Sequence, residues 1–185
     1  MAHIDPLLER NKHFATTNAR EGTSIAAKLK VYVITCLDPR TDPSAFLELG
    51  LGDAMVIRNA GGRVSPDVLT DLAYIGYLST VVIPGGPRFE VAVIHHTDCG
   101  THFLADEDFR RGFAALAGAD DAALAAEAVV DPGQTVRADV ELLRSSAILP
   151  STITVSGHVY DVNTGLVTTV APAAPMHAAP TAASG

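Results

Sequence analysis

The chain of 185 residues lacks long apolar runs. None of its apolar stretches reaches the roughly 18 residues that a membrane-spanning helix needs, which argues against a membrane partner. The N-terminus has no apolar signal region either, since Asp5, Glu9 and Arg10 fall among its first residues. We therefore expect a cytoplasmic protein without a secretory signal.

Basic residues are also scarce. The sequence has 13 Lys and Arg against 21 Asp and Glu, a formal net charge of −8. A nucleic-acid partner would require clustered Lys and Arg, so we exclude one. The acidic surface would neither attract nor repel a small neutral substrate. The apolar fraction of 48% and the length fit one domain with a core of its own.

Only two cysteines are present, Cys36 and Cys99. A structural disulfide is disfavoured because nothing points to an oxidising compartment. Two small buried hydrophobic residues are the plainest interpretation of such a pair. The absence of any Cys-x-x-Cys pair argues against a closed structural zinc finger. Both cysteines, however, follow apolar runs, and Cys99 belongs to a His-x-x-Cys pair, which favours a metal site.

Polar and liganding residues follow two short apolar runs. Residues 31–34 are β-branched or aromatic, the pattern of a strand that is covered on both faces. Asp38-Pro39 ends this strand, so Cys36, Asp38 and Arg40 lie just past its carboxyl end, where open α/β sheets bind their ligands. A second run, residues 91–94, leads in the same way into His96 and Cys99.

Helix and strand signals alternate along the chain. Asp or Ser followed by Pro marks helix starts at residues 5, 42 and 65, because such residues cap a helix and Pro fits its first turn. Further helices are predicted from residue 106, within 117–133 and over 136–143, and strands over 31–34, 53–57, 91–94, 151–155, 159–162 and 166–170. Asn163-Thr-Gly165 is a hairpin turn. We predict an α/β fold with a mainly parallel central β-sheet, flanked by helices, and an antiparallel edge hairpin near the C-terminus.

Two thiolates and one imidazole form a ligand set for a metal. Cys36, His96 and Cys99 supply three protein ligands and leave a fourth position open, as in catalytic rather than structural zinc sites. Zinc lowers the pKa of a bound water toward neutrality and so provides hydroxide. Arg40 would hold the Asp38 carboxylate ionised and oriented, so that it accepts a hydrogen bond from this hydroxide. Away from such a ligand set, the same pair would be an ordinary surface ion pair.

The motif Cys36-x-Asp38-x-Arg40 followed by His96-x-x-Cys99 resembles the β-class carbonic anhydrases, in particular their small bacterial members. The resemblance includes Arg58-Asn-Ala-Gly61, the stretch around His96 and the closing hairpin, and covers roughly residues 5–170. It implies one Zn²⁺ per chain on the Cys₂His set, with Asp38 and Arg40 as the catalytic pair. The turn formed by Asn59, Ala60, Gly61 and Gly62 is a candidate wall of the substrate pocket.

The resemblance also implies an activity and an assembly. Zinc-bound hydroxide would attack carbon dioxide, bicarbonate would leave, and a proton would pass to solvent. In some relatives the counterpart of Asp38 moves onto the metal when the pH falls. The N-terminal helix would embrace a neighbouring subunit in a homodimer or tetramer. We thus divide the chain into a helix and arm (residues 1–30), a zinc-binding α/β domain (31–170) and a disordered Ala/Pro tail (171–185).

Some features depart from the family pattern. No tryptophan is present, so the non-catalytic bicarbonate site of certain relatives is expected to be absent. Residues 84–87 form an apparent insertion before the third strand. His102 is either a proton relay or a plain surface histidine. His95 is interpreted as a hydrogen-bonded core histidine, and Asp98 as a hydrogen-bond partner in a local turn or loop.

Other functions remain open. Some members of this fold hydrolyse carbonyl sulfide or carbon disulfide, and the same hydroxide would attack the same type of carbon. A thiol- or zinc-sensing module would use Cys36 and Cys99 but would leave Asp38 and Arg40 without a role. A phosphate-binding module at residues 59–62 lacks the full dinucleotide fingerprint and a P-loop lysine.

Overall fold

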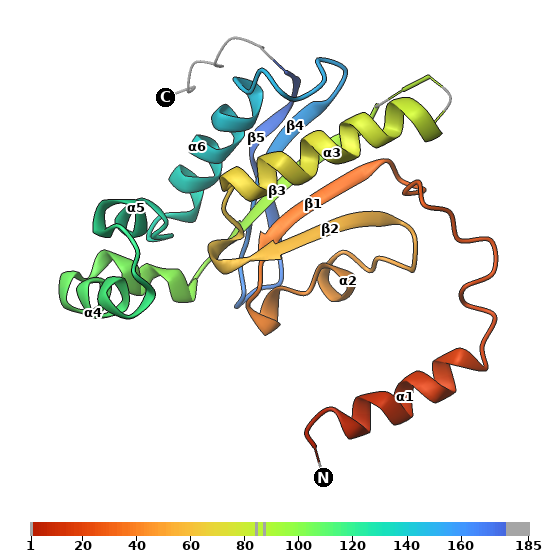
Figure 1. Ribbon diagram of the computed structural model, residues 1–185, viewed down its shortest axis with the longest axis horizontal. Coiled ribbons are helices and arrows are strands. Elements are labelled where there is room, and N and C mark those ends of the chain that lie inside the picture. Colours follow the sequence, from red (N-terminus) through yellow and green to blue (C-terminus); the bar gives the residue numbers. More distant parts are fainter. Residues whose placement is uncertain (1, 84, 87, 177–185) are drawn as a thin grey trace.

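A five-stranded sheet in the order β2-β1-β3-β4-β5 forms the centre of the molecule (Figure 1). The computed structural model describes residues 2–83, 85–86 and 88–176. Neighbouring strands are parallel except for the last pair, β4 and β5. The strands are β1 (Val31–Cys36), β2 (Ala54–Asn59), β3 (Glu90–His96), β4 (Thr154–Tyr160) and β5 (Val167–Pro175). The predicted α/β fold with an antiparallel edge near the C-terminus is confirmed.

Most helices begin where the sequence supplies a capping side chain. The helix predicted to be capped by Asp5 is an exception, because Asp5 is its first residue and Ile4 before it makes no side-chain cap hydrogen bond. The side chains of Asp42, Ser65, Asp106, Asp120 and Asp131 each accept a hydrogen bond from a backbone N–H in the first turn. The α-helices are α1 (Asp5–Ala15), α2 (Pro43–Phe46), α3 (Pro66–Val82), α4 (Glu107–Ala117), α5 (Asp121–Ala126) and α6 (Pro132–Arg144), and the short 3₁₀ turns are η1 (Pro39–Thr41), η2 (Ala60–Gly62) and η3 (Gly100–Ala105).

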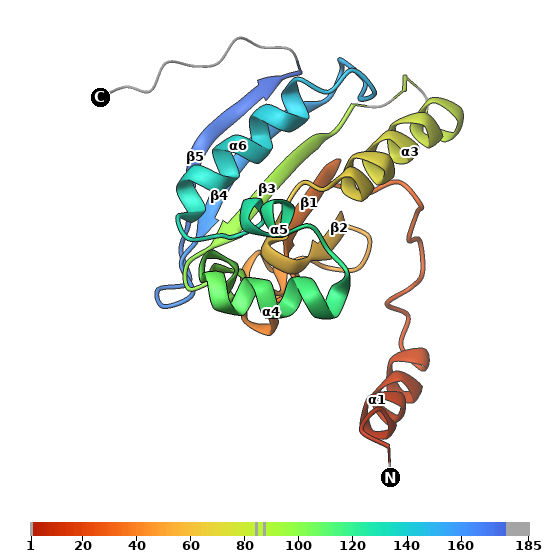
Figure 2. The same ribbon diagram turned by 60° about the vertical axis from the view of Figure 1, so that its left-hand side comes forward.

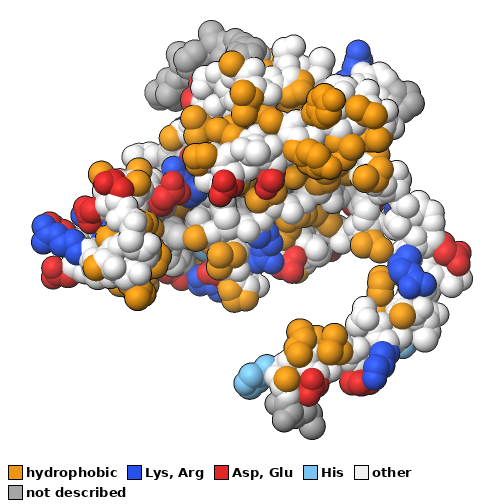
Figure 3. Space-filling model, in the orientation of Figure 1, with side chains coloured by type: hydrophobic (Ala, Val, Ile, Leu, Met, Phe, Trp, Pro, Cys, Tyr) orange, Lys and Arg blue, Asp and Glu red, His pale blue; other side chains and the backbone are white. Residues whose placement is uncertain are grey.

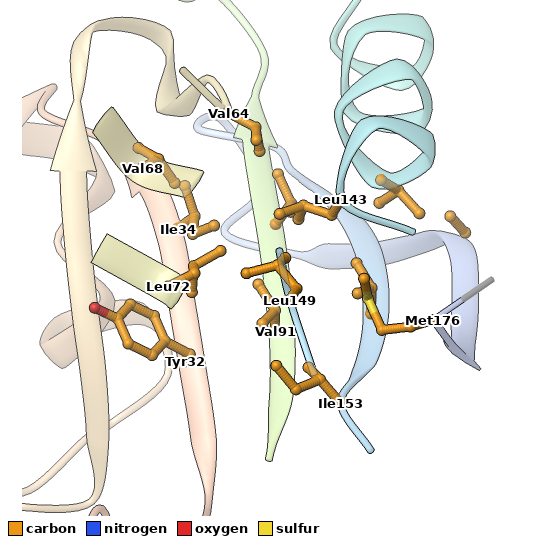
Figure 4. Close-up of a cluster of buried hydrophobic side chains, with 14 of the residues drawn as sticks. Tyr32, Ile34, Val64, Val68, Leu72, Val91, Leu143, Leu149, Ile153 and Met176 are labelled. Carbon is orange, nitrogen blue, oxygen red and sulfur yellow. The ribbon is translucent and has the colours of Figure 1, made fainter. Parts of the chain in front are cut away.

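The main core lies between the sheet and helices α3 and α6, which cover the same face (Figures 1 and 4). Ile34 from β1, Leu72 from α3 and Leu143 from α6 are fully buried there. The other face is covered near the ends of β1 and β3, where Phe46 from α2 stacks on Tyr160. Cover on both faces explains why β1 and β3 are continuous apolar runs.

The C-terminal end of the fold corrects two predictions. Residues 151–155 and 159–162 were expected to form separate strands, but β4 runs unbroken from Thr154 to Tyr160. Its Gly157 lies in the strand because α6 approaches closely: an added Cβ would come within 2.9 Å of Val140 Cγ2.

The predicted start of a disordered tail at residue 171 is too early in the chain. Residues 171–175 belong to β5, and Ala171 and Met176 are buried. Arg144 donates a hydrogen bond to the carbonyl of Pro172, and the Met176 N–H donates to the carbonyl of Ile153. These contacts order the backbone although its side chains are small. Residues 177–185 lie outside the part that the structure describes, as do Pro84 and Pro87 of the apparent insertion.

Helix α1 stands away from the sheet at the end of an irregular arm of residues 16–30 (Figures 1 and 2). None of its residues is buried. Its apolar side chains Ile4, Leu7, Leu8 and Phe14 are all exposed, and Figure 3 shows hydrophobic atoms gathered on this helix. Every helix that the structure describes is too short or too polar to span a membrane.

Candidate functional site

The three residues proposed as ligands meet at one edge of the sheet. Cys36 ends β1, His96 ends β3, and Cys99 directly precedes η3. Because β1 and β3 are adjacent parallel strands, their carboxyl ends lie together. One candidate ligand atom from each of the three residues lies within 4.8 Å of the other two, and all three residues are at most 3% exposed.

The geometry of these atoms fits a tetrahedral zinc ion. Two thiolates at the usual Zn–S distance of about 2.3 Å in a tetrahedron lie about 3.8 Å apart. The Sγ atoms of Cys36 and Cys99 are 3.9 Å apart. His96 Nδ1 lies 2.9 Å from the carbonyl oxygen of Thr97, so it carries the proton and donates, which leaves the Nε2 lone pair free. This Nε2 atom is buried and has no hydrogen-bond partner among the described residues, as expected for a nitrogen that binds metal.

Contact between the two thiols prepares one of them for deprotonation. The hydrogen bond from Cys36 lowers the pKa of Cys99 to about 6, while the same contact, with burial, raises the pKa of Cys36 to about 12. Without metal, the pair therefore exists near neutral pH as one thiolate and one thiol that share a proton. A cation that binds here displaces the remaining proton, so its affinity rises with pH.

A network around Arg40 lies beside the ligand atoms. Arg40 donates to both carboxylate oxygens of Asp38, from Nη2 at 2.7 Å and from Nε at 3.0 Å. It also donates from Nη1 to the Asp98 carboxylate at 2.7 Å and from Nη2 to the Asp98 carbonyl at 2.9 Å. Mainly through the side-chain hydrogen bond from Arg40, the pKa of Asp38 falls to about 2. Asp38 is thus a fixed, ionised acceptor that is mostly shielded from solvent.

The sequence interpretation made Asp98 a hydrogen-bond partner in a local turn or loop but did not identify Arg40 as its partner. Its backbone adopts a left-handed conformation with φ of 54°, and its side chain and carbonyl both bind Arg40. A signal was present in the sequence. Arginine has five donors, and a single carboxylate two residues away cannot satisfy all of them.

Two further side chains hold the loop that follows β1. Arg58 donates from Nε to the Cys36 carbonyl at 3.0 Å and from Nη2 to the Asp38 carbonyl at 2.7 Å. The hydroxyl of the buried Thr41 lies 2.9 Å from the same two carbonyl oxygens. The sequence identified Arg58 only as part of a motif and did not identify Thr41. Both fix the backbone that carries Cys36 and Asp38.

The glycine-rich turn at residues 59–62 lies directly behind the cysteines. Gly62 is buried with φ of 69°, and an added Cβ would lie 2.9 Å from the backbone nitrogen of Cys36. At Gly61 an added Cβ would lie 3.1 Å from the hydroxyl of Thr101, which contacts the Cys99 sulfur at 3.2 Å. Asn59 donates to the Arg63 carbonyl, and Ala60 is exposed. A wall of the substrate pocket at this turn remains a prediction.

The two flanking histidines differ in their surroundings. His95 is fully buried and hydrogen-bonded through both ring nitrogens, which confirms its interpretation as a core histidine. His102 Nδ1 lies 2.7 Å from the carbonyl oxygen of Cys99, and the His102 ring packs on the ring of Phe103. The role of His102 as a proton relay remains a prediction.

Comparison with known proteins gives one consistent result. The family model described as carbonic anhydrase matches residues 31–167. The β-carbonic anhydrase 1 of Mycobacterium tuberculosis is 32% identical over 142 residues, which cover 77% of this chain and 82% of that protein. The crystal structure of carbonic anhydrase from Streptococcus mutans superposes with a TM-score of 0.74 at 32% identity, and the match covers 92% of this chain and 98% of that one.

More distant relatives include enzymes with another substrate. A carbon disulfide hydrolase from an Acidianus species is 25% identical over 193 residues, which cover 88% of this chain and 86% of that protein. The family match over most of the chain and the identity of 32% to a curated member show that this chain belongs to the β-class carbonic anhydrase family.

Proposed function

We propose that this chain is a zinc-dependent carbonic anhydrase that catalyses the reversible hydration of carbon dioxide to bicarbonate. The observation that carries the proposal is the Cys36–His96–Cys99 set with the ionised Asp38 beside it. The identity of 32% to a curated β-carbonic anhydrase supports it.

The residues around the site have defined parts in this reaction. Zinc, when bound, supplies a Lewis acid that makes water a nucleophile near neutral pH. Asp38, held by Arg40, accepts a hydrogen bond from the attacking water. This hydrogen bond orients the water so that a lone pair of the water oxygen points at the substrate carbon. Arg58 and Thr41 keep the loop of Asp38 in place during turnover. His102 is the candidate that hands the released proton to solvent.

The proposal is tested by metal analysis and turnover on one preparation. We expect one zinc per chain in the wild type, and loss of zinc and of carbon dioxide hydration in Cys36→Ser and Cys99→Ser. The control is His102→Gln, which alters a neighbouring imidazole outside the ligand set and should retain zinc. Full zinc occupancy in either serine variant would refute the ligand assignment.

Hydrolysis of carbon disulfide or carbonyl sulfide is the second candidate, because carbon disulfide hydrolases align over 88% of the chain. Their identity of 25% is lower than the 32% to the carbonic anhydrase, which supports carbon dioxide as the first candidate. Turnover of all three substrates by the same zinc-loaded preparation decides between them. A preparation that hydrolyses carbon disulfide but does not hydrate carbon dioxide would reverse the order.

A thiol- or zinc-sensing module is the non-enzymatic alternative. It needs the adjacent thiols, 3.9 Å apart, but gives no role to the Asp38–Arg40–Asp98 network. The enzymatic function uses both features. A zinc-loaded chain without turnover of any of the three substrates would favour the sensing module.

The proposed assembly is a homodimer or tetramer in a cytoplasmic setting, in which α1 and its arm pack on a neighbouring subunit. The support for the assembly is the apolar side of α1, which has no buried residue in the isolated chain.

A further inference from the structure

A buried carboxylate ties helix α6 to the glycine-rich turn behind the site. Asp139 is 2% exposed. Its two oxygens accept from Arg63 Nη2 and Nε, both at 2.9 Å, and Oδ2 also accepts from the backbone N–H of Val64 at 3.0 Å. A buried charge is costly unless it is paired in this way. Arg63 also donates to the carbonyl of Ala126, so that the turn is held from two helices.

The same carboxylate reaches the strand that carries His96. His95 Nε2 lies 3.2 Å from Asp139 Oδ2 and 3.2 Å from the Gly62 carbonyl. Both oxygens are acceptors, so Nε2 carries the proton, and Nδ1 accepts from the hydroxyl of Thr135 at 2.8 Å. His95 therefore bridges α6, the glycine-rich turn and the end of β3.

The glycine-rich turn lies against residues that hold both cysteines. Gly62 packs on the backbone of Cys36, and Gly61 packs on Thr101, whose hydroxyl contacts the Cys99 sulfur. The position of the turn therefore bears on the backbone of Cys36 and on the hydroxyl that contacts the Cys99 sulfur. The backbone of His95 is continuous with that of His96.

We propose that Asp139 and His95 are positioning residues that set the spacing of Cys36, His96 and Cys99 for metal binding. They act through Arg63, Gly62 and the end of β3 and do not touch the ligand atoms. Stability alone does not require this arrangement, because apolar residues of similar size often replace a buried ion pair without loss. The inference rests on the proposed zinc site, whose ligands must match a tetrahedral ion.

The test measures metal affinity rather than turnover. Asp139→Asn keeps the volume of the side chain, but its amide turns one acceptor into a donor that opposes Arg63 or His95. We expect the zinc dissociation constant of the full chain, measured by competition with a chelator, to rise 10- to 100-fold, the usual effect of losing a group that orients a ligand. The absorption spectrum of the Co²⁺-loaded protein should change as well.

A matched control separates positioning from stability. Glu90 starts β3 and accepts a hydrogen bond from the buried Ser156 at 2.6 Å, at the far end of the strand from His96. Glu90→Gln should lower the melting temperature but leave the zinc dissociation constant and the Co²⁺ spectrum unchanged. If Asp139→Asn does not fold, Thr135→Val removes only the hydroxyl that binds His95 and should weaken zinc binding several-fold.

Each result has one interpretation. Wild-type zinc affinity and an unchanged Co²⁺ spectrum in Asp139→Asn, or in Thr135→Val if the former does not fold, would overturn the positioning role. Equal losses of affinity in Glu90→Gln and Asp139→Asn would overturn it too, since any destabilisation would then suffice. A wild-type chain that binds no zinc would refute the proposed function itself, and with it this inference.

Discussion

Arg40 determines the state of the carboxylate beside the site. Its side chain is about half exposed, and exposed ion pairs contribute only about 0–1 kcal/mol to stability. It nevertheless binds both oxygens of Asp38 and two oxygens of Asp98. Such a geometry contributes orientation rather than stability, because a carboxylate held at both oxygens cannot rotate freely. Asp98 thus joins the two motif-bearing loops through one guanidinium group.

Asp38→Asn tests whether this orientation serves the reaction. The substitution keeps the volume but replaces one acceptor oxygen with a donor amide, so the attacking water loses its acceptor. We expect carbon dioxide hydration to slow by about 10²-fold, the typical effect of a positioned proton-handling group. Zinc content should stay near that of the wild type.

The control for this substitution is Asp42→Asn. Asp42 caps α2 and pairs with Arg58 close to the same loop, whereas the described hydrogen bonds and ion pairs of Arg40 go to Asp38 and Asp98. Its substitution should change the rate little. An unchanged rate in Asp38→Asn would instead reduce the Asp38–Arg40 pair to a structural ion pair.

The pKa of Asp139 makes a prediction about stability and pH. Burial alone would raise this pKa, but hydrogen bonds from His95 and Arg63 outweigh burial and lower it to about 2. A carboxylate with a lowered pKa stabilises the fold above its unfolded pKa, near 4, and this contribution is lost as the pH falls toward 2. The contribution at pH 7 is about 2–3 kcal/mol.

Urea unfolding of the metal-free protein checks this prediction. Wild type and Asp139→Asn should differ most in their free energy of unfolding at pH 7, and the difference should shrink between pH 4 and pH 2. A difference that stays constant with pH would show that the lost packing, not the charge, accounts for the effect.

The sequence predicts the residues of the site better than their contacts. Cys36, His96 and Cys99 could be grouped because their types and their places after apolar runs both indicate a metal site. The five donors of Arg40 indicate a further acceptor, but the choice of Asp98 depends on loop conformations such as its left-handed backbone. The contacts of Thr41 depend on the loop conformation in the same way. Hydrogen bonds across a loop leave no periodic pattern in the sequence.

At the level of elements, the turn η2 is closely constrained by the residues around the site. Gly62 and Gly118 both have positive φ, 69° and 62°. An added Cβ at Gly118 meets nothing within 4 Å, whereas one at Gly62 meets the backbone of Cys36 at 2.9 Å. A substitution at Gly118 therefore measures only the cost of a side chain in the left-handed conformation. A substitution at Gly62 adds the cost of a steric clash.

We predict that Gly118→Ala lowers the free energy of unfolding by about 1–2 kcal/mol, the cost of a left-handed alanine. Gly62→Ala should lower it by more and should also weaken zinc binding, because Cys36 must move. Chemical unfolding and zinc competition measure the two effects. Equal stability losses with unchanged zinc binding would mean that η2 relaxes without displacing Cys36.

Elements with a strong local signal were predicted correctly, and those that depend on neighbours were not. The Asp-Pro and Ser-Pro caps located the starts of α2 and α3. Two separate strands were predicted over 151–155 and 159–162, yet β4 is continuous through Gly157, where α6 leaves no space for a side chain. The Ala/Pro stretch after residue 170 looked too poor to pack, yet β4 supplies hydrogen bonds and α6 supplies Arg144 to order it.

For the whole molecule, the question left by the isolated chain is what covers α1. An isolated helix of 11 residues is marginal in water, because nucleation is costly and few hydrogen bonds compensate. The apolar residues Ile4, Leu7, Leu8 and Phe14 share one side of it by their spacing. The alternation of strands and helices predicts the fold class, but it contains no information about contacts between chains. The embrace of a second subunit is therefore a proposal.

Sedimentation of the intact chain and of variants in α1 tests this proposal. We expect the wild type to sediment as a dimer or tetramer, and a chain without residues 1–25 to form smaller species. Leu8→Lys places a charge on the apolar side of α1 and should also shift the protein toward smaller species. Glu9→Lys introduces the same side chain on the opposite side, where the lost ion pair with Lys12 is exposed and contributes little, and should leave the assembly intact. A monomeric wild type would refute the embrace. Equal effects of the two lysine variants would also refute it, because burial of one side of α1 predicts that only that side is sensitive to an added charge.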